Sequence, residues 1–389
     1  MSANKVTAGI LALILSAGAA LSPLPCFDRA LPAAAAIEVY TTGTYEGMTY
    51  KKYGNRVEIT NYDDSAAALQ IPAEIAGLPV TAIGANAFQN STSLKNVTIP
   101  DTVTSIGKSA FMECEYLEIV YFSEGLFTIG ERAFEHCSFL TSVTLPDSVT
   151  EIGLRAFAHC AALSSVHVGA HTEKIGASAF TGCRKLRHAS LGTDLRILSG
   201  DAFSDCVNLE QIRIPDGVAK IETSTFSGCT YLKYVTLPDS LTFIGSDAFS
   251  DCKFLEELVL PPTVSMVDGR AFYGADKLHL VVKNPDCSLF SDENTLDRAA
   301  VISGFPDSTA KAYADTFGNS FIPLETLPGS VDLDETLTVT DAVFLQQYLL
   351  SQRSLIPKQY ETADMTQDGI VDAFDLALLK KTLIGRSTT

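Results

Sequence analysis

A repeat of constant length runs through the middle of this chain of 389 residues. A Phe recurs every 23 residues, a Leu follows each Phe by six positions, and apolar residues usually follow at nine and eleven positions. No insertion interrupts the nine units, whose aromatic residues are Phe88, Phe111, Phe134, Phe157, Phe180, Phe203, Phe226, Phe249 and Phe272. A unit this short cannot bury its own apolar side, so neighbouring units must stack and share one continuous core.

The apolar positions nine and eleven residues after each Phe alternate with variable ones, which is the pattern of a half-buried strand. Stacked parallel strands lie about 4.8 Å apart, so nine units predict a ladder on the order of 40 Å long. The variable residues between the apolar ones should share one exposed surface. Aromatic and Arg side chains dominate binding hot spots, so we expect contacts with a ligand at Tyr121, His167, His188, Arg213 and Tyr234. The alternative is that this surface is merely solvated.

Seven consecutive units carry a cysteine three residues after the Phe. They are Cys114, Cys137, Cys160, Cys183, Cys206, Cys229 and Cys252. Disulfides between successive units are one interpretation, since a separation of about 4.8 Å falls within the Cα range of a disulfide. Stacked side chains point the same way and seven is an odd number, so we favour a column of buried small residues. Metal binding by Cys137 and Cys160 with their neighbours His136 and His159 is a third, less favoured interpretation, because adjacent residues in such a coil face opposite ways.

The units resemble bacterial leucine-rich repeats of the BspA-like type, whose unit reads roughly AF-x-x-C-x-x-L-x-x-V-x-[IL]-P-x-x-[VL]-x-x-IG. Residues Tyr50 to Gly84 resemble the entry segment of that family, and Gly304 to Ala314 resemble its closing cap. The resemblance implies an α/β repeat solenoid of nine leucine-rich units with both caps over residues 37–325. It also implies recognition of a protein or a glycan.

After Glu325 the 23-residue period stops, and two oxygen-rich loops follow that are offset by 34 residues. A loop of the EF-hand kind binds Ca²⁺ through oxygens at positions 1, 3, 5, 7, 9 and 12, with a glycine at position 6. In the clearer copy Gly369 takes position 6. The six ligand positions hold Asp364, Thr366, Asp368, the carbonyl of Ile370, Asp372 and Asp375.

The earlier copy begins with a serine and has Glu335 where the glycine should stand. Its ligand positions hold Ser330, Asp332, Asp334, the carbonyl of Thr336, Thr338 and Asp341. Loss of one carboxylate and of the glycine that tolerates a positive φ should weaken this site. We therefore expect two Ca²⁺ sites, of which Asp364 to Asp375 is the stronger. Helices are predicted after the loops over 342–350 and 376–384, the second ending at Gly385.

This pair of loop–helix segments resembles a dockerin of the cellulosome kind, which implies a small all-α domain over residues 326–389. In that family the module docks onto a cohesin of a scaffoldin, through loop positions 10 and 11 and the helix after them. The matching residues are Val339, Thr340, Gln346 and Gln347 in the first copy and Ala373, Phe374, Lys380 and Lys381 in the second. Because the two sets differ chemically, we expect one docking orientation rather than two interchangeable ones.

The first 36 residues have the pattern of a secretory signal peptide. One basic residue, Lys5, precedes an uncharged apolar run that is short for a membrane span. A lipid anchor at Cys26 is disfavoured because Pro25 precedes it. We therefore expect a secreted chain without membrane insertion.

Charge and motif content restrict the function further. The chain has 28 Lys and Arg against 46 Asp and Glu, a formal charge of −18, so nucleic acids and anionic membranes should be repelled. No nucleophile elbow, zinc-ligand cluster or phosphate loop is evident, and no catalytic residue is predicted. The favoured function is a secreted, non-catalytic cellulosome component. The alternatives are a spacer or adhesin for cell or substrate surfaces, and a polysaccharide hydrolase whose paired carboxylates sequence spacing does not reveal.

Overall fold

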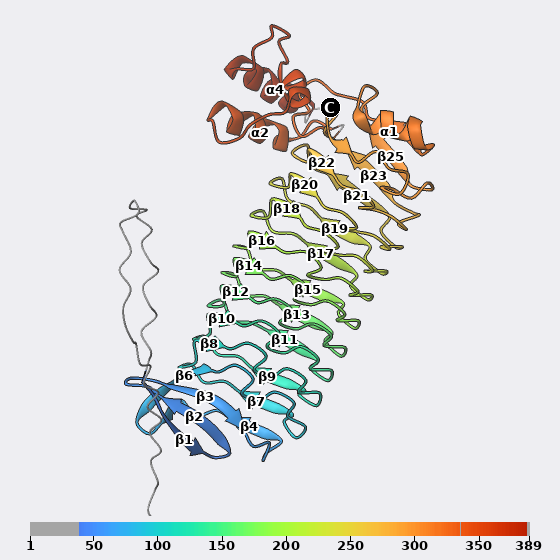
Figure 1. Ribbon diagram of the computed structural model, residues 1–389. Coiled ribbons are helices and arrows are strands. Elements are labelled where there is room, and N and C mark those ends of the chain that lie inside the picture. Colours follow the sequence, from blue (N-terminus) through green and yellow to red (C-terminus); the bar gives the residue numbers. More distant parts are fainter. Residues whose placement is uncertain (1–38, 335, 387–389) are drawn as a thin grey trace, which may run out of the picture. The chain divides into compact units, whose positions relative to one another are not determined.

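A computed structural model describes residues 39–334 and 336–386 of the chain (Figure 1). The predicted signal peptide and Cys26 lie outside the described residues, as does Glu335. The folded part begins with an antiparallel meander of three strands, β1 (Thr41–Tyr45), β2 (Met48–Lys52) and β3 (Val57–Tyr62). Strands β4 (Ala68–Gln70), β5 (Glu74–Ile75) and β6 (Leu78–Ile83) follow, and β3 pairs with β6 in parallel. The meander thereby covers the first edge of the row of strands that begins at β6, which would otherwise expose unpaired backbone groups.

Each repeat contributes one longer and one shorter strand, and Figure 1 shows the two resulting rows side by side. The longer strands are β7 (Asn96–Thr98), β9 (Ile119–Tyr121), β11 (Ser142–Thr144), β13 (Ser165–His167), β15 (His188–Ser190), β17 (Gln211–Arg213), β19 (Tyr234–Thr236), β21 (Glu257–Leu260) and β23 (His279–Val282). The shorter strands are β8 (Ser105–Ile106), β10 (Thr128–Ile129), β12 (Glu151–Ile152), β14 (Lys174–Ile175), β16 (Ile197–Leu198), β18 (Lys220–Ile221), β20 (Phe243–Ile244), β22 (Met266–Val267) and β24 (Ser288–Leu289). Pairing is parallel and follows the repeat, as in Val143 opposite Val166 and Ile152 opposite Ile175.

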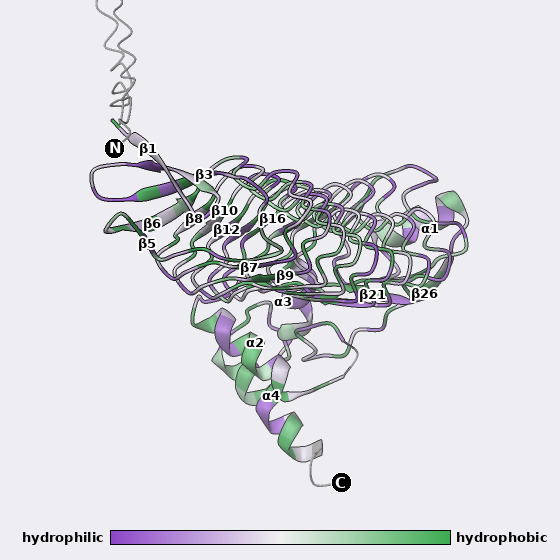
Figure 2. Ribbon diagram, turned by 90° about the horizontal axis from the view of Figure 1, so that it is seen from below, coloured by the Kyte–Doolittle hydropathy of each residue, from purple (hydrophilic) through white to green (hydrophobic). Residues whose placement is uncertain are grey.

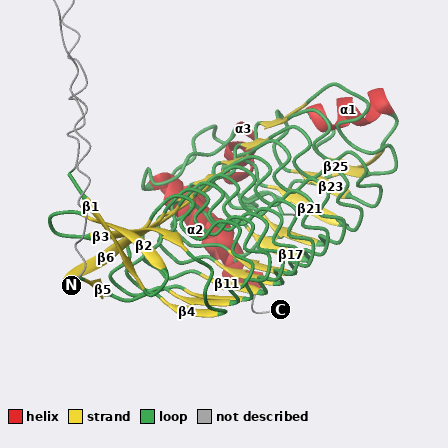
Figure 3. Cartoon of the chain, turned by 60° about the horizontal axis from the view of Figure 1, so that its bottom comes forward, coloured by secondary structure: helices red, strands yellow, loops and turns green. Residues whose placement is uncertain are grey.

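The predicted leucine-rich-repeat solenoid is confirmed, and its coils consist of strands and turns. In Figure 3 yellow strands alternate with green loops through the repeats. Within the described repeats, the segment around each Phe is a series of turns and not a helix. Residues two positions before and after most of these Phe adopt a positive φ, for example Arg132 (57°) and His136 (61°) around Phe134. These left-handed residues reverse the chain twice per coil.

The core of the repeats is a column of stacked Phe rings. The nine Phe side chains are 0–1% exposed, and neighbouring centroids lie between 4.7 Å (Phe88 and Phe111) and 5.8 Å (Phe203 and Phe226) apart. The ring planes of successive units deviate by at most 16°. A strict period brings equivalent side chains into register, so the apolar face of every coil is covered by its neighbours.

The repeat cysteines are buried in the same core as the Phe rings, which confirms the prediction of a column of buried small residues. All seven repeat cysteines are 0% exposed and carry free thiols. Each thiol donates to the carbonyl oxygen of the Phe one unit earlier, as Cys137 Sγ does to Phe111 over 3.2 Å. Burial raises the pKa of these thiols, to about 12 for Cys114. The thiols are therefore protonated, and they are engaged inside the core and not available as metal ligands.

The closing cap consists of β25 (Val301–Gly304), helix α1 (Thr309–Phe317) and β26 (Ser320–Pro323). Strand β26 pairs in parallel with β25, which itself continues the row of longer strands. Ser308 Oγ accepts the amide of Lys311 at the start of α1, and Gly318 ends the helix with a φ of 82°. The cap therefore closes the far end of the row.

The C-terminal region is helical and has its own apolar cluster. It contains α2 (Val339–Leu349), α3 (Pro357–Ala363) and α4 (Ala373–Arg386). Val331, Leu345 and Leu379 are buried at its centre, and Figure 2 shows hydrophobic and hydrophilic residues alternating along α2 and α4. The expected end of the last helix at Gly385 is wrong, because α4 continues through this glycine to residue 386. Among the described residues, no helix has both the length and the apolar character needed to cross a bilayer.

Candidate functional site

The second loop is folded by its first and last carboxylates. Asp375 is 0% exposed, and its Oδ1 and Oδ2 accept the amides of Thr366 (3.0 Å) and Asp372 (2.8 Å). Asp364 Oδ2 accepts the amide of Gly369 over 2.8 Å. Gly369 has a φ of 84°, a conformation that residues with a Cβ rarely adopt, so the turn depends on glycine.

The first loop repeats this geometry 34 residues earlier. Asp341 is 0% exposed, with Oδ1 accepting the amide of Val331 (2.7 Å) and Oδ2 that of Thr338 (2.8 Å). At position 1, Ser330 Oγ accepts the amide of Asp334 over 3.2 Å, where Asp364 uses a carboxylate in the other copy. The first loop therefore holds the same fold with one negative charge fewer at that position.

The oxygens of both loops fit a hard cation. Asp332 Oδ1 is buried and has no hydrogen-bond partner. Burial, reinforced by the nearby charges of Asp341 and Asp334, raises the pKa of Asp332 to about 7. An anionic oxygen in this position is stabilised by a positive ion. In the second loop Asp364, Asp368, Asp372 and Asp375 supply carboxylates within twelve residues. Oxygen donors without nitrogen or sulfur are the set that Ca²⁺ prefers.

Helix α3, which the sequence analysis missed, connects the two loops. Gln359 is 2% exposed and donates from Nε2 to the carbonyl oxygen of Val331 over 2.8 Å. The hydroxyl of Tyr360, on the next residue, accepts the amide of Val371 over 3.1 Å. Pro357 at the first helical position was the available signal for this helix. Its seven residues are too few for a recognisable apolar period.

The residues expected to contact a cohesin lie mostly at the surface of this helical module. Val339 is 71% and Phe374 75% exposed, both at the start of their helices. Thr340, Gln346, Ala373, Lys380 and Lys381 are also exposed, and Gln347 is half-buried. An exposed valine and an exposed phenylalanine distinguish the two copies chemically.

The five residues expected to form the recognition surface of the repeats are all exposed on the longer strands. Tyr121 lies on β9, His167 on β13, His188 on β15, Arg213 on β17 and Tyr234 on β19. A hollow of about 490 Å³ on this face is lined by Arg213 and Tyr234 together with small residues such as Ala189 and Ser190. A neighbouring hollow is lined by His167 and His188. The strand face therefore combines aromatic, cationic and imidazole groups around a depression.

Parallel coils of constant period around a stacked Phe column define a leucine-rich-repeat solenoid. The C-terminal module contains two oxygen-rich loops, each followed by a helix. The family described as BspA type leucine rich repeat region matches residues 70–187 and 150–279, in six copies. This match spans more than half of the chain, which therefore belongs to the BspA-type leucine-rich-repeat family. The dockerin type I domain matches residues 328–384.

Solved structures of bacterial leucine-rich-repeat proteins are similar to this chain. A leucine-rich repeat protein from Bacteroides ovatus is 24% identical, covers 70% of this chain and 71% of its own, and has a TM-score of 0.56. The leucine-rich repeat protein of T. pallidum is 28% identical over 55% of this chain and 91% of its own, with a TM-score of 0.44. A leucine-rich cell surface protein from Faecalibacterium prausnitzii is 24% identical over 74% and 96%, with a TM-score of 0.41. The Bacteroides structure supports the fold. No curated protein matches the chain.

The two family matches also carry general functional implications. Dockerin type I domains bind calcium, and the domain implies binding to a cohesin and association with a cellulosome. Leucine-rich repeats imply protein recognition. Both families are non-catalytic modules.

Proposed function

We propose that this chain is a secreted, non-catalytic cellulosome component in which the dockerin docks onto a scaffoldin cohesin and the repeats recognise a protein or glycan. The observation that carries the proposal is the equivalence of Asp341 and Asp375. Each is fully buried and accepts backbone amides from both ends of its loop, which fixes the path of the oxygen-rich backbone before the helix. Such a loop organises the start of the helix that follows, and the proposed docking residues lie at this start and farther along the same helix.

Docking depends on calcium in this proposal, with one ion in each loop. The ligands are the twelve residues predicted from the sequence, six in 330–341 and six in 364–375. The second site is the stronger one, because it has Asp364 at position 1 and Gly369 in the tight turn. The first site has Ser330 in the equivalent place, but its unpartnered Asp332 Oδ1 favours a cation as well.

Recognition by the repeats occurs on the strand face around Arg213 and Tyr234. An open face supports binding and not chemistry, because catalysis favours a closed and dry pocket. Extracellular localisation follows from the leader pattern of the sequence together with the dockerin match.

Cohesin binding is tested with the full chain and a panel of purified cohesins, in Ca²⁺ and after addition of EGTA. We expect capture in Ca²⁺, release in EGTA, and a loss of at least tenfold in affinity for Asp364→Ala combined with Asp368→Ala. A matched control, Asp101→Ala with Asp216→Ala, removes two exposed acids from the repeats and should bind as the parent chain does. Equal capture with and without Ca²⁺, or no capture by any cohesin, would refute the proposed docking.

The repeats are tested separately from docking. Glycan and protein arrays probed with the chain bearing a blocked dockerin should give signals that fall when Arg213 and Tyr234 are replaced by Ala. Absence of any signal supports the spacer alternative. Hydrolysis of plant polysaccharides by the purified chain would support the hydrolase alternative instead.

A further inference from the structure

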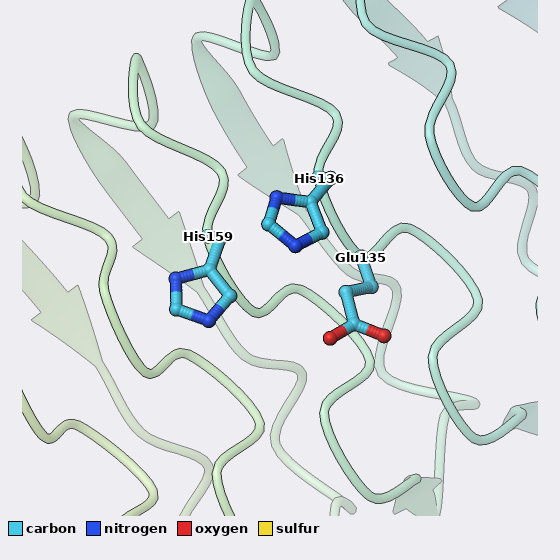
Figure 4. A group of neighbouring side chains, drawn as sticks. All are labelled: Glu135, His136 and His159. Carbon is cyan, nitrogen blue, oxygen red and sulfur yellow. The ribbon is translucent and has the colours of Figure 1, made fainter. Parts of the chain in front are cut away.

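We propose that Glu135, His136 and His159 form a binding site for a divalent transition metal ion, of which Zn²⁺ is the probe. Figure 4 shows the three side chains together, and their ligand atoms all lie within 4.8 Å of one another. The site lies on the turns next to the Phe column and is distinct from the two oxygen-only loops. It would hold the ion between two consecutive coils of the solenoid.

The period of the repeat brings the two imidazoles together. His136 and His159 each follow a core Phe by two positions, with φ values of 61° and 60°. Their rings are stacked with a centroid separation of 4.8 Å and an interplanar angle of 15°. In the next unit the equivalent residue is Gly182, and a Cβ there would collide with Nδ1 of His159. The ring of His159 therefore occupies space that the glycine of the next coil leaves open.

Glu135 supplies the third ligand from a buried position. Its side chain is 4% exposed, with Arg155 Nε 3.0 Å from Oε1 and Arg132 Nε 3.5 Å from Oε2. Oε2 has no hydrogen-bond partner of suitable geometry. A buried carboxylate oxygen left in this way costs free energy unless a partner compensates it. The two arginines hold the carboxylate in place, and a bound ion would give Oε2 a second positive partner beside Arg132.

The donor set favours transition metals over calcium. Two imidazole nitrogens and one carboxylate oxygen suit Zn²⁺, Cu²⁺ or Ni²⁺, and three protein ligands leave one position open for water or a ligand. Arg155 Nη2 lies 3.4 Å from His159 Nε2. A metal ion bound at Nε2 of His159 would displace this contact with Arg155. Zinc–ligand distances of about 2.0–2.2 Å require a rotation of the rings, which the exposed His136 permits.

The test measures Zn²⁺ binding to the full chain by isothermal titration calorimetry, with Ca²⁺ in large excess to fill the dockerin loops and without a polyhistidine tag. The variants are His136→Ala, His136→Ala with His159→Ala, and Glu135→Gln. The matched control is His167→Ala with His188→Ala, which also removes two imidazoles from adjacent units but on the strand face. Circular dichroism and thermal unfolding without zinc establish that each variant is folded.

We expect one Zn²⁺ per chain in the parent and in the control, with the same affinity. Affinity should fall at least tenfold in His136→Ala and in Glu135→Gln, and the site should be absent in the double variant. Addition of Zn²⁺ should raise the unfolding temperature of the repeats in the parent and the control only, because the ion binds the stacked coils. Unchanged zinc binding in the double variant, or loss of binding in the control, would overturn the proposal. His136 is exposed, so its single variant keeps the test valid if the buried Glu135 variant fails to fold.

Discussion

Gln359 donates from Nε2 to the carbonyl oxygen of Val331 over 2.8 Å, and this bond joins α3 to the first calcium loop. The same side chain accepts the amide of Ile356 through Oε1 at 3.2 Å, so both ends of a 2% exposed amide are used. A helix of seven residues is marginal by itself and depends on such tertiary contacts. These two hydrogen bonds make the Gln359 amide important for holding α3 against the first loop.

Replacement of Gln359 by Ala should destabilise the dockerin. The change leaves the carbonyl of Val331 without its buried donor, which costs about 1–3 kcal/mol. Gln352→Ala, at an exposed position between α2 and α3, is the matched control and should be nearly neutral. Scanning calorimetry in Ca²⁺ measures the effect, and equal unfolding temperatures for the two variants would contradict this role.

Removal of calcium should unfold the helical module while the repeats remain folded. The module has a small apolar cluster, and an ion bound only by the folded form stabilises it by about 2.7 kcal/mol when its concentration is 100 times the dissociation constant. Hydrogen exchange read by mass spectrometry after EGTA should show loss of protection over 331–386 and retained protection around the Phe column. Retained protection in the helices would argue against this coupling of metal binding and folding.

The two docking faces should contribute unequally to cohesin affinity. The docking residues of the second copy include Phe374, an aromatic side chain that is 75% exposed, and those of the first copy include no aromatic side chain. One variant replaces the second set, Ala373, Phe374, Lys380 and Lys381, and the other replaces the first set, Val339, Thr340, Gln346 and Gln347. Aromatic side chains dominate interface hot spots, so the variant that replaces Phe374 and its set should weaken binding at least tenfold more than the variant that replaces Val339 and its set. Surface plasmon resonance with one cohesin measures both, and equal losses would indicate two interchangeable orientations.

The repeats should lose stability at alkaline pH through their cysteines. Burial raises the pKa of Cys114 and Cys183 from 9.0 to about 12, so the folded state holds thiol protons that the unfolded state releases. The stabilisation is complete below about pH 9 and is lost as the pH rises toward 12, by up to about 1.4 kcal/mol per pH unit for each thiol. Chemical denaturation at pH 7, 9 and 10 should show this slope. A variant with Cys160, Cys183 and Cys206 replaced by Ala should show a smaller one, and an identical slope would exclude the thiols as its cause.

Much of the fold was predictable because the controlling signals are periodic. Phe134 and Phe157 stand one period apart, and stacking alone places their rings 5.1 Å from each other. The same period predicted that Cys137 and Cys160 are buried in the core and that Arg213 and Tyr234 are exposed on the strands, as the structure shows. The oxygen-rich loop that contains Asp364 and Asp368 was predictable because its residues are neighbours within twelve positions of the chain.

Other features depended on contacts that no local spacing encodes. Helix α3 has too short a pattern to be recognised, and its partners Val331 and Val371 come from two different loops. The sequence suggests Cys137 and Cys160 as possible metal ligands beside His136 and His159. In the structure the two thiols donate hydrogen bonds to Phe carbonyl oxygens inside the core. The carboxylate that does lie beside the two rings belongs to Glu135.

The amino-acid sequence by itself determined the architecture of this protein, because a strict 23-residue period leaves stacking as the only way to bury the apolar side of each unit. It also determined which oxygen donors the two C-terminal loops carry, since these residues are neighbours along the chain. Only the tertiary structure decided which side chains of different coils face one another. The proposed metal site shows this. Left-handed turns place His136 and His159 on neighbouring coils, Gly182 leaves room for the ring of His159, and Glu135 is buried beside them. This arrangement exists only after the coils have stacked.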